Sequence, residues 1–148
     1  MTAAGPSERL DPGSDPARIT IHRKVEYPDT DASGHYQNAA VMRWVQAAEA
    51  ELHERLGIVD RTFGHSPRLH FEVDFLERLW FLDSIEVDLA ISHVGRSSAR
   101  YDFTVRRGNV IAARGWYAVA HVPRGKDKAE TWPDDLRNAF REGGAGVT

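Results

Sequence analysis

Residues Val25–Trp44 are VEYPDTDASGHYQNAAVMRW, and the rest of the chain is organised around this segment. It runs from the end of an alternating strand, through an acidic turn, into an amphipathic helix. The turn places carboxylate and imidazole groups just before a helix N-terminus, which presents unpaired N–H groups and a partial positive charge. A carbonyl docked there would be polarised, and Asp31 would be placed to attack it or to activate water against it.

The same segment resembles the hotdog-fold acyl-CoA thioesterases of the 4-hydroxybenzoyl-CoA thioesterase type. These enzymes carry an Asp-x-Asp turn, often continued as Gly-His-Val-Asn-Asn-Ala, and then a helix with an aromatic residue one turn in. Here the pattern is Asp29-Thr30-Asp31-Ala-Ser-Gly34-His35-Tyr36-Gln37-Asn38-Ala39, and the resemblance extends from about Ile19 to Val122. It implies hydrolysis of an acyl-CoA or acyl-carrier-protein thioester to free acid and thiol, without a metal or redox cofactor.

Length and composition set the broad class. A chain of 148 residues is expected to form one domain with a proper core. Its 19 Lys and Arg against 22 Asp and Glu provide no large basic excess for nucleic acid, and no basic amphipathic helix indicates a membrane surface. There is no Cys for a disulfide, a thiolate nucleophile or a metal ligand. Without a long apolar segment or an apolar N-terminal run, a cytoplasmic enzyme or binding protein is the default expectation.

Periodicity along the chain predicts the elements. Residues 1–17, rich in Pro, Gly and Ser, are expected to form a flexible tail. Residues 19–27 alternate as a half-buried strand, and residues 37–56 carry an apolar stripe at helical spacing. Further strands are expected at about 69–75, 85–92, 99–106 and 110–122, and Pro133 with the acids after it starts a short helix. Residues 58–67 are expected to form a loop, and residues 143–148 a flexible C-terminus.

This order predicts an α+β hotdog fold, in which an antiparallel five-stranded sheet wraps around one long helix, with a short C-terminal helix. The single domain is expected to span residues 18–142. Such a sheet has exposed edges, which are a liability unless paired. The resemblance implies that two chains pair edge strands and build the active site at their interface, so a homodimer or homotetramer is expected. Several polar side chains of the long helix are expected on its surface, namely Arg43, Gln46, Glu49, His53 and Glu54.

Asp31 is the main catalytic candidate. By residue type alone it is a turn or helix-capping aspartate. In the family the second Asp of this turn is the nucleophile or general base, and that position is Asp31. Asp29 is expected to hold the turn. We expect the Asp31 carboxylate to lie beside the amide-rich tip of the helix, with room for a thioester between them.

Three other residues are candidates for the catalytic set. His35 either orients Asp31 or donates to the substrate, or it is a polar turn residue at the pocket rim. The resemblance implies that the backbone N–H at Asn38 polarises the thioester carbonyl, whereas its side chain is equally suited to bonding the helix start. Glu51 is either a helix-borne carboxylate facing the site or a partly buried, paired structural residue. Gly34, in the same motif, is a candidate for substrate binding.

Coenzyme A carries phosphates, so a docking patch of Arg or Lys is expected. Arg96, Ser97 and Arg100 are the first candidates for substrate binding, and Arg124, Lys126 and Lys128 are others. The apolar run Leu79–Leu82 either packs on a neighbouring subunit or lines an acyl channel. The chain also departs from the family pattern. Gln37 replaces the usual first Asn, and Arg78 and Leu82 stand where the segment Tyr-x-x-Pro-x-x-x-Gly-Asp has Pro and Gly.

Two other functions compete with hydrolysis. One is a non-catalytic acyl-CoA-binding hotdog dimer that kept the fold. The other is a hydratase, but the hotdog hydratases use Asp-x-Asn-Pro-x-His, and Asp31 and His35 lack that spacing and the Asn-Pro. The seven His residues show no metal-ligand spacing, and the chain lacks the Gly-x-Ser-x-Gly elbow of serine hydrolases.

Overall fold

The computed structural model describes residues 10–146, so residues 1–9 of the expected N-terminal tail and residues 147–148 of the C-terminus lie outside it. Its strands are β1 (Arg18–Lys24), β2 (Arg68–Phe75), β3 (Ser84–Val94), β4 (Ser98–Arg107) and β5 (Val110–Ala120). Its helices are the 3-10 helix η1 (Tyr27–Asp29), the long α1 (Asn38–Leu56), the short α2 (Val59–Thr62) and α3 (Asp134–Glu142).

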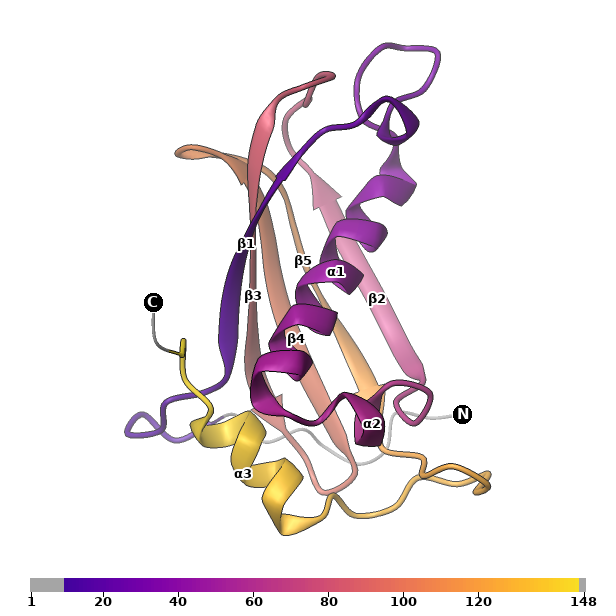
Figure 1. Ribbon diagram of the computed structural model, residues 1–148, viewed down its shortest axis with the longest axis vertical. Coiled ribbons are helices and arrows are strands. Elements are labelled where there is room, and N and C mark those ends of the chain that lie inside the picture. The colour runs from indigo at the N-terminus through magenta and orange to yellow at the C-terminus, as the bar shows by residue number, and fades with distance from the viewer. Residues whose placement is uncertain (1–9, 147–148) are drawn as a thin grey trace.

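The five strands form one sheet in the order β1-β3-β4-β5-β2, and every pairing is antiparallel. Figure 1 shows the sheet curving along α1, with α3 at the end away from the start of α1. Successive side chains along β3 and β4 point to opposite faces of the sheet. Those on the inner face are buried, and those on the outer face are mostly half-buried. The predicted architecture and element order are therefore confirmed.

The core lies between α1 and the inner face of the sheet. The predicted apolar stripe of α1 is buried, with Val41, Val45, Ala48 and Leu52 all at 0% exposure. The expectation that Glu49 and His53 lie on the helix surface is wrong, since their exposed fractions are 4% and 1%. They extend the buried face because a helix lying in a curved sheet is covered over more than its apolar stripe.

Two boundaries differ from the sequence prediction. The first strand ends at Lys24 instead of continuing to Tyr27, whose side chain is 78% exposed rather than part of the inner row. The chain turns there because Pro28 enters η1 and the Asp29 carboxylate accepts the Glu26 N–H at 2.8 Å. The expected loop at 58–67 contains α2, which starts directly after Gly57 ends α1 in the left-handed conformation.

The described parts of the two terminal segments pack on each other. Ala17 is fully buried, and its N–H donates to the carbonyl of Phe140 at 2.9 Å. The Gly144 carbonyl accepts the Arg18 N–H at 3.0 Å, and Arg55 reaches the same carbonyl at 2.6 Å. The start of β1 is therefore covered by residues that follow α3.

Gly115, in the middle of β5, is a position where the sheet leaves no room for a side chain. An added Cβ would lie 2.9 Å from Cζ of Phe103 and 2.9 Å from Cα of Val73, and it would also meet the carbonyl oxygen of Glu72. We expect Gly115→Ala to lower the free energy of unfolding by roughly 3 kcal/mol, because the clash is with backbone that cannot move without breaking the ladder. Urea unfolding followed by circular dichroism measures the change.

Gly13→Ala is the control for this measurement. No atom lies within 4 Å of a Cβ added at Gly13, so its unfolding free energy should stay within about 0.5 kcal/mol of the wild type. Equal stability of the two variants would contradict the close packing at Gly115.

Candidate active site

The turn between β1 and α1 is held by Asp29, as the sequence predicts. Asp29 is buried, and its carboxylate accepts the Glu26 N–H at 2.8 Å and a guanidinium N–H of Arg43 at 2.9 Å. Its carbonyl accepts the Gln37 N–H at 2.7 Å. One aspartate thus fixes both the entry to the turn and its approach to the helix.

Asp31 lies on the exposed side of the turn. Its carboxylate accepts the Ser33 N–H at 2.8 Å and the Ser33 hydroxyl, and these are its side-chain hydrogen bonds among residues 10–146. The bonds from the Ser33 hydroxyl and amide hold the pKa of Asp31 below its usual value. The described part of one chain therefore does not enclose Asp31, and the cleft expected around it is not formed by a single chain.

The first turn of α1 has free amides. Gln37, at the N-cap, makes no side-chain cap, because its amide donates to the Pro28 carbonyl at 2.7 Å instead. The N–H groups of Asn38 and Ala39 have no acceptor among the described residues, and the first turn contains no acidic side chain. Two unpaired donors and the positive end of the helix dipole are thus available to an oxygen atom.

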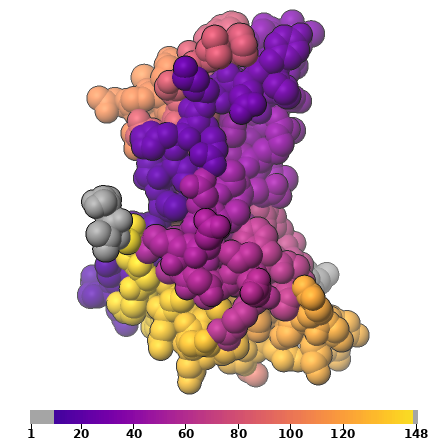
Figure 2. All heavy atoms as spheres, in the orientation of Figure 1, coloured from indigo at the N-terminus to yellow at the C-terminus, as the bar shows by residue number. Residues whose placement is uncertain are grey.

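A cavity of about 570 Å³ opens beside this helix end. Figure 2 shows the segments that form it, the turn after β1 and residues 76–83, meeting at the top of the molecule. The predicted residues His35 and Asn38 line it, together with residues from the ends of β2 and β4 and the 76–80 segment: Tyr36, Phe75, Leu76, Glu77, Arg78, Trp80 and Arg107. The cavity lining does not include Asp31.

Hydrogen bonds and a ring contact attach the 76–83 segment to the turn between β1 and α1. Tyr36 donates its N–H to the Leu79 carbonyl at 2.9 Å, and His35 and Trp80 form an isolated β-bridge with their rings edge-to-face at 5.8 Å. Gly34 has φ 88°, and a Cβ there would lie 3.5 Å from the Trp80 ring. Leu82 adopts φ 71°, which a glycine takes without strain, at the position where the resembled family has Gly.

The remaining predicted site residues lie elsewhere. Glu51 forms an ion pair with Arg23 and is half-buried, as its structural alternative predicts. Arg96 and Ser97 lie in the β3–β4 turn, at the opposite end of the sheet from the start of α1. Arg100 bonds Asp102 at 2.8 Å and lies over the Trp116 ring. One chain does not bring these residues to the cavity. Trp80 belongs to the apolar run that the sequence suggested for an acyl channel or a subunit contact, whereas sequence reasoning did not select Arg78 or Arg107 for the site.

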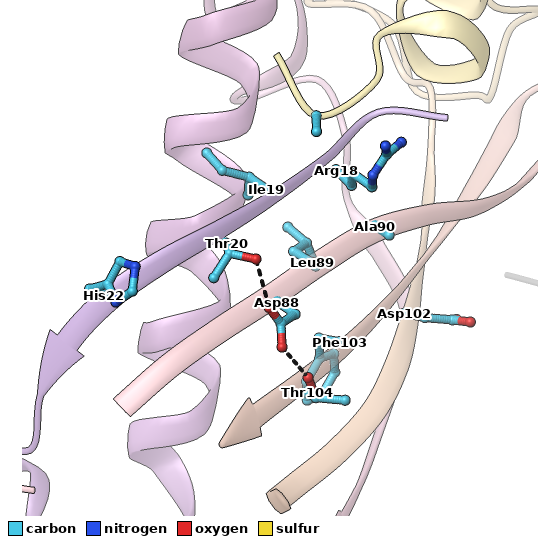
Figure 3. Close-up of a pocket in the computed structure, with 11 residues that line it drawn as sticks. Arg18, Ile19, Thr20, His22, Asp88, Leu89, Ala90, Asp102, Phe103 and Thr104 are labelled. Atoms are coloured by element: carbon cyan, nitrogen blue, oxygen red, sulfur yellow. Dashed lines mark hydrogen bonds between the residues drawn. The ribbon is translucent and has the colours of Figure 1, made fainter. Parts of the chain in front are cut away.

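A second cavity, also of about 570 Å³, lies over β1, β3 and β4. Figure 3 shows Asp88 at its centre, accepting the hydroxyls of Thr20 and Thr104. Partial burial acts to raise the pKa of Asp88, but hydrogen bonds from Arg106 and the two threonines hold it below its usual value. A carboxylate already paired and bonded on each side is a poor general base, so this cavity is a weaker candidate for chemistry.

Buried polar groups gather at the far half of α1. His53 bonds the Thr62 hydroxyl and the Tyr101 hydroxyl, each at 2.6 Å. Since Thr62 donates to the Ile58 carbonyl, the His53 Nδ1–H donates to Thr62 and Nε2 accepts from Tyr101. This neutral form agrees with burial, which lowers the pKa of His53 to about 4.

Glu49 is the second buried group of this region. It accepts a guanidinium N–H of Arg68 at 2.9 Å, and the Arg68 guanidinium lies 4.5 Å from the centre of the Tyr117 ring. Burial raises the pKa of Glu49, and Arg68 offsets part of that rise. The Glu49 carboxylate is thus paired with Arg68 inside the fold, so we assign this pair a structural role.

Two classes of feature are absent among the described residues. Within residues 10–146, His, Asp and Glu side chains nowhere gather in threes as metal ligands. Over the same range, every helix is too short or too polar to cross a membrane.

A five-stranded antiparallel sheet around one long helix, with a turn of this pattern at the helix start, defines a hotdog-fold thioesterase. The family model described as "Thioesterase-like superfamily" matches residues 25–140, and the chain belongs to this family. The protein is thus a thioester hydrolase by family.

Similar proteins agree with this assignment. The acyl-CoA thioesterase YbgC of Haemophilus influenzae is 25% identical over 122 residues, which cover 79% of this chain and 90% of that protein. A predicted thioesterase from Bacillus stearothermophilus has the same fold, with TM-score 0.77, 22% identity, and coverage of 88% of this chain and 100% of that one. A thioesterase from Thermus thermophilus, solved with coenzyme A and Zn, has TM-score 0.73, 24% identity, and coverage of 82% and 90%.

The buried His53 makes a measurable contribution to pH dependence. Its pKa is 6.5 when unfolded and about 4 when folded, so the unfolded chain binds the proton first as the pH falls. Stability is therefore lost from about pH 6.5 down to pH 4, by roughly 3 kcal/mol from this group. We expect the stability gap between the wild type and His53→Gln to shrink by that amount between pH 7 and pH 4 in urea unfolding.

His22→Gln is the matched control, because His22 is exposed on β1. Its free energy of unfolding at pH 7 should stay within about 0.5 kcal/mol of the wild type, because an exposed side chain is replaced. A constant gap for His53→Gln would show that His53 is not held neutral by the fold.

Proposed function

We propose that the protein hydrolyses acyl-CoA thioesters to a free acid and coenzyme A, with Asp31 as general base or nucleophile. The carrying observation is the family match over residues 25–140, which includes the Asp29–Asn38 motif at the start of α1. An acyl-CoA is favoured over an acyl-carrier thioester because the curated relative, YbgC, is named an acyl-CoA thioesterase.

The reaction needs hydrogen-bond donors that stabilise the oxyanion formed from the thioester carbonyl, and a base or nucleophile. The free N–H groups of Asn38 and Ala39 would donate to the thioester oxygen and stabilise the negative charge that develops on it. As a base, Asp31 would take a proton from water while the water oxygen bonds to the carbonyl carbon. The C–S bond then breaks, and the thiolate leaves and takes up the proton. As a nucleophile, Asp31 would attack the carbonyl carbon and form a mixed anhydride, while the C–S bond breaks and the thiolate leaves. Water would then hydrolyse the anhydride to the free acid and restore the Asp31 carboxylate.

The exposure of Asp31 implies that a second chain completes the site. Within residues 10–146 β2 pairs only with β5, so its other edge is free. Its inward side chains Phe71 and Val73 are only partly buried, whereas those of β3 and β4 are buried. A free edge beside an open flank of the core favours pairing of two β2 strands about a two-fold axis.

Such pairing would be antiparallel, so the end of β2 that carries Phe75 would lie next to the end that carries Arg68 in the second chain. The cavity at the start of α1 and the turn that carries Asp31 would then face the Arg68 end of β2 in the second chain. This arrangement would turn an exposed carboxylate into a residue at a cleft between subunits. We therefore propose a homodimer as the active unit.

Asp31→Asn tests the chemistry directly. The amide keeps the size of the side chain but neither removes a proton nor attacks a carbonyl, so we expect kcat to fall at least about 100-fold. The measurement is thiol release from a panel of straight-chain and aromatic acyl-CoAs. Equal rates for the wild type and the variant would remove Asp31 from the mechanism.

Ser33→Ala gives a graded second test. Removing the hydroxyl removes the largest influence that lowers the pKa of Asp31, so that pKa rises. The acid limb of the pH–rate profile should then move to higher pH, because the carboxylate must be ionised to act. An unmoved limb, together with an inactive Asp31→Asn, would show that Asp31 is not the titrating group.

The exposed position of Asp31 and its bonding within its own turn favour one alternative, a non-catalytic acyl-CoA-binding dimer. It predicts tight binding of acyl-CoA without turnover across the same panel, and no effect of Asp31→Asn on that binding.

Val73→Lys tests the proposed dimer. A charge on the inner face of the β2 edge would be buried in the interface, so we expect a monomer in sedimentation velocity and at least a tenfold loss of kcat/KM. Ile19→Lys is the matched control, since Ile19 is also half-buried on an edge strand but on β1. It should remain a dimer. A wild type that is active as a monomer would contradict the proposal.

A further inference from the structure

Two arginines line the cavity at the start of α1, and they differ in their partners. Arg107 is committed to the protein, since it donates to Asp83 at 3.1 Å and to the Arg78 carbonyl at 3.4 Å. The guanidinium of Arg78 has no hydrogen bond or ion pair among residues 10–146. Arg78 is therefore a lining residue whose positive charge has no partner from the described chain.

Arg78 is held in place by its backbone. Leu79, the next residue, is buried, and its carbonyl accepts the Tyr36 N–H at 2.9 Å. Trp80 is bridged to His35, and its N–H donates to Asp83 at 2.8 Å. The segment that carries Arg78 is thus tied to the turn before α1, so the fold sets where the Arg78 backbone lies relative to the helix start.

The charges around the cavity favour an anion. Arg78 and the uncapped end of α1 are positive, and Arg107 neutralises Asp83 behind it. Glu77 is the one carboxylate that lines the cavity, and no ion pair joins it to Arg78 within the described chain. An arginine kept free beside a site for a carbonyl group is suited to a carboxylate, which it binds with two parallel hydrogen bonds.

We propose that Arg78 binds a second carboxylate at the far end of the acyl group, so that the substrates are thioesters of dicarboxylic acids. This inference rests on the proposed thioesterase function and names its substrate class. The coenzyme A phosphates are the other anionic source, but the pantetheine arm separates them from the thioester carbonyl by many bonds. A cavity of about 570 Å³ that also borders the helix start suits the acyl group itself. Arg78 is also a departure of this chain, at a position where the resembled family has Pro.

The test compares matched substrates that differ in one carboxylate: adipoyl-CoA with hexanoyl-CoA, and glutaryl-CoA with pentanoyl-CoA. The readout is the ratio of kcat/KM for the carboxylated over the neutral member of each pair. We expect the wild type to favour the carboxylated member about tenfold or more, and Arg78→Gln to lower that ratio by a similar factor. Arg78→Glu should reverse it.

Arg114→Gln is the matched control. Arg114 is an exposed arginine of β5 that does not line this cavity, and it should leave the ratio at the wild-type value. The same acyl pairs as N-acetylcysteamine thioesters, which lack the phosphates, separate the two anionic sources. Loss of the preference on these shorter thioesters in Arg78→Gln supports the acyl carboxylate.

Two results would overturn the inference while leaving the thioesterase function intact. One is an unchanged ratio in Arg78→Gln. The other is a loss that affects both members of a CoA pair equally and disappears with the N-acetylcysteamine thioesters, which would assign Arg78 to the phosphates. If the wild type hydrolyses none of the thioesters, the proposed function fails. Calorimetric binding of adipoyl-CoA against hexanoyl-CoA by the wild type and Arg78→Gln then decides the inference separately.

Discussion

Burial of α1 against the inner face of a curved sheet is the constraint on which the rest of the structure depends. The apolar stripe from Val41 to Leu52 is fully covered, and this fixes where both ends of the helix lie. Its start is carried to the sheet end where β2 and β4 finish, and its end to the α2 and α3 side. Because α1 runs along the sheet, its N-terminus lies at one end of the molecule and its C-terminus at the other. The two ends therefore present different chemical groups.

The polar groups at these two ends are used differently. At the far end, His53 and Glu49 are buried, and each is satisfied by a neighbour from another element, so they stabilise a particular packing. At the start of α1, the helix amides lack a cap and Arg78 lacks a partner within the described chain. Unsatisfied groups at an open cavity are available to a ligand, whereas satisfied buried groups are not. This contrast, more than cavity size, separates the candidate active site from the equally large cavity around Asp88.

The two edges of the sheet are also unequal. The start of β1 is covered by the segment after α3, through Gly144 and Arg55, whereas β2 keeps a free edge and a half-open core flank. In one chain Asp31 is exposed and the candidate active site is open to solvent. This is consistent with the proposed dimer, in which a second chain pairs with β2 and encloses the site. Within the described residues, the sheet thus has one edge whose start is covered by its own chain and one edge that is left unpaired.

The sequence by itself determined the order of the main elements and the place of the acidic turn before α1, because both depend on local periodicity and on a short motif. Alternation located the four strands after the helix, and helical spacing located the stripe of α1. It could not determine which polar residues of α1 are buried, as Glu49 and His53 show, since burial depends on how far the sheet curves around the helix. Nor could it bring Arg78 and Trp80 to the start of α1, or separate Arg100 from it. Arg78 and Trp80 reach the start of α1 through the Tyr36 bond to Leu79 and the bridge between His35 and Trp80. These contacts join segments far apart in the chain, which only the tertiary structure decides.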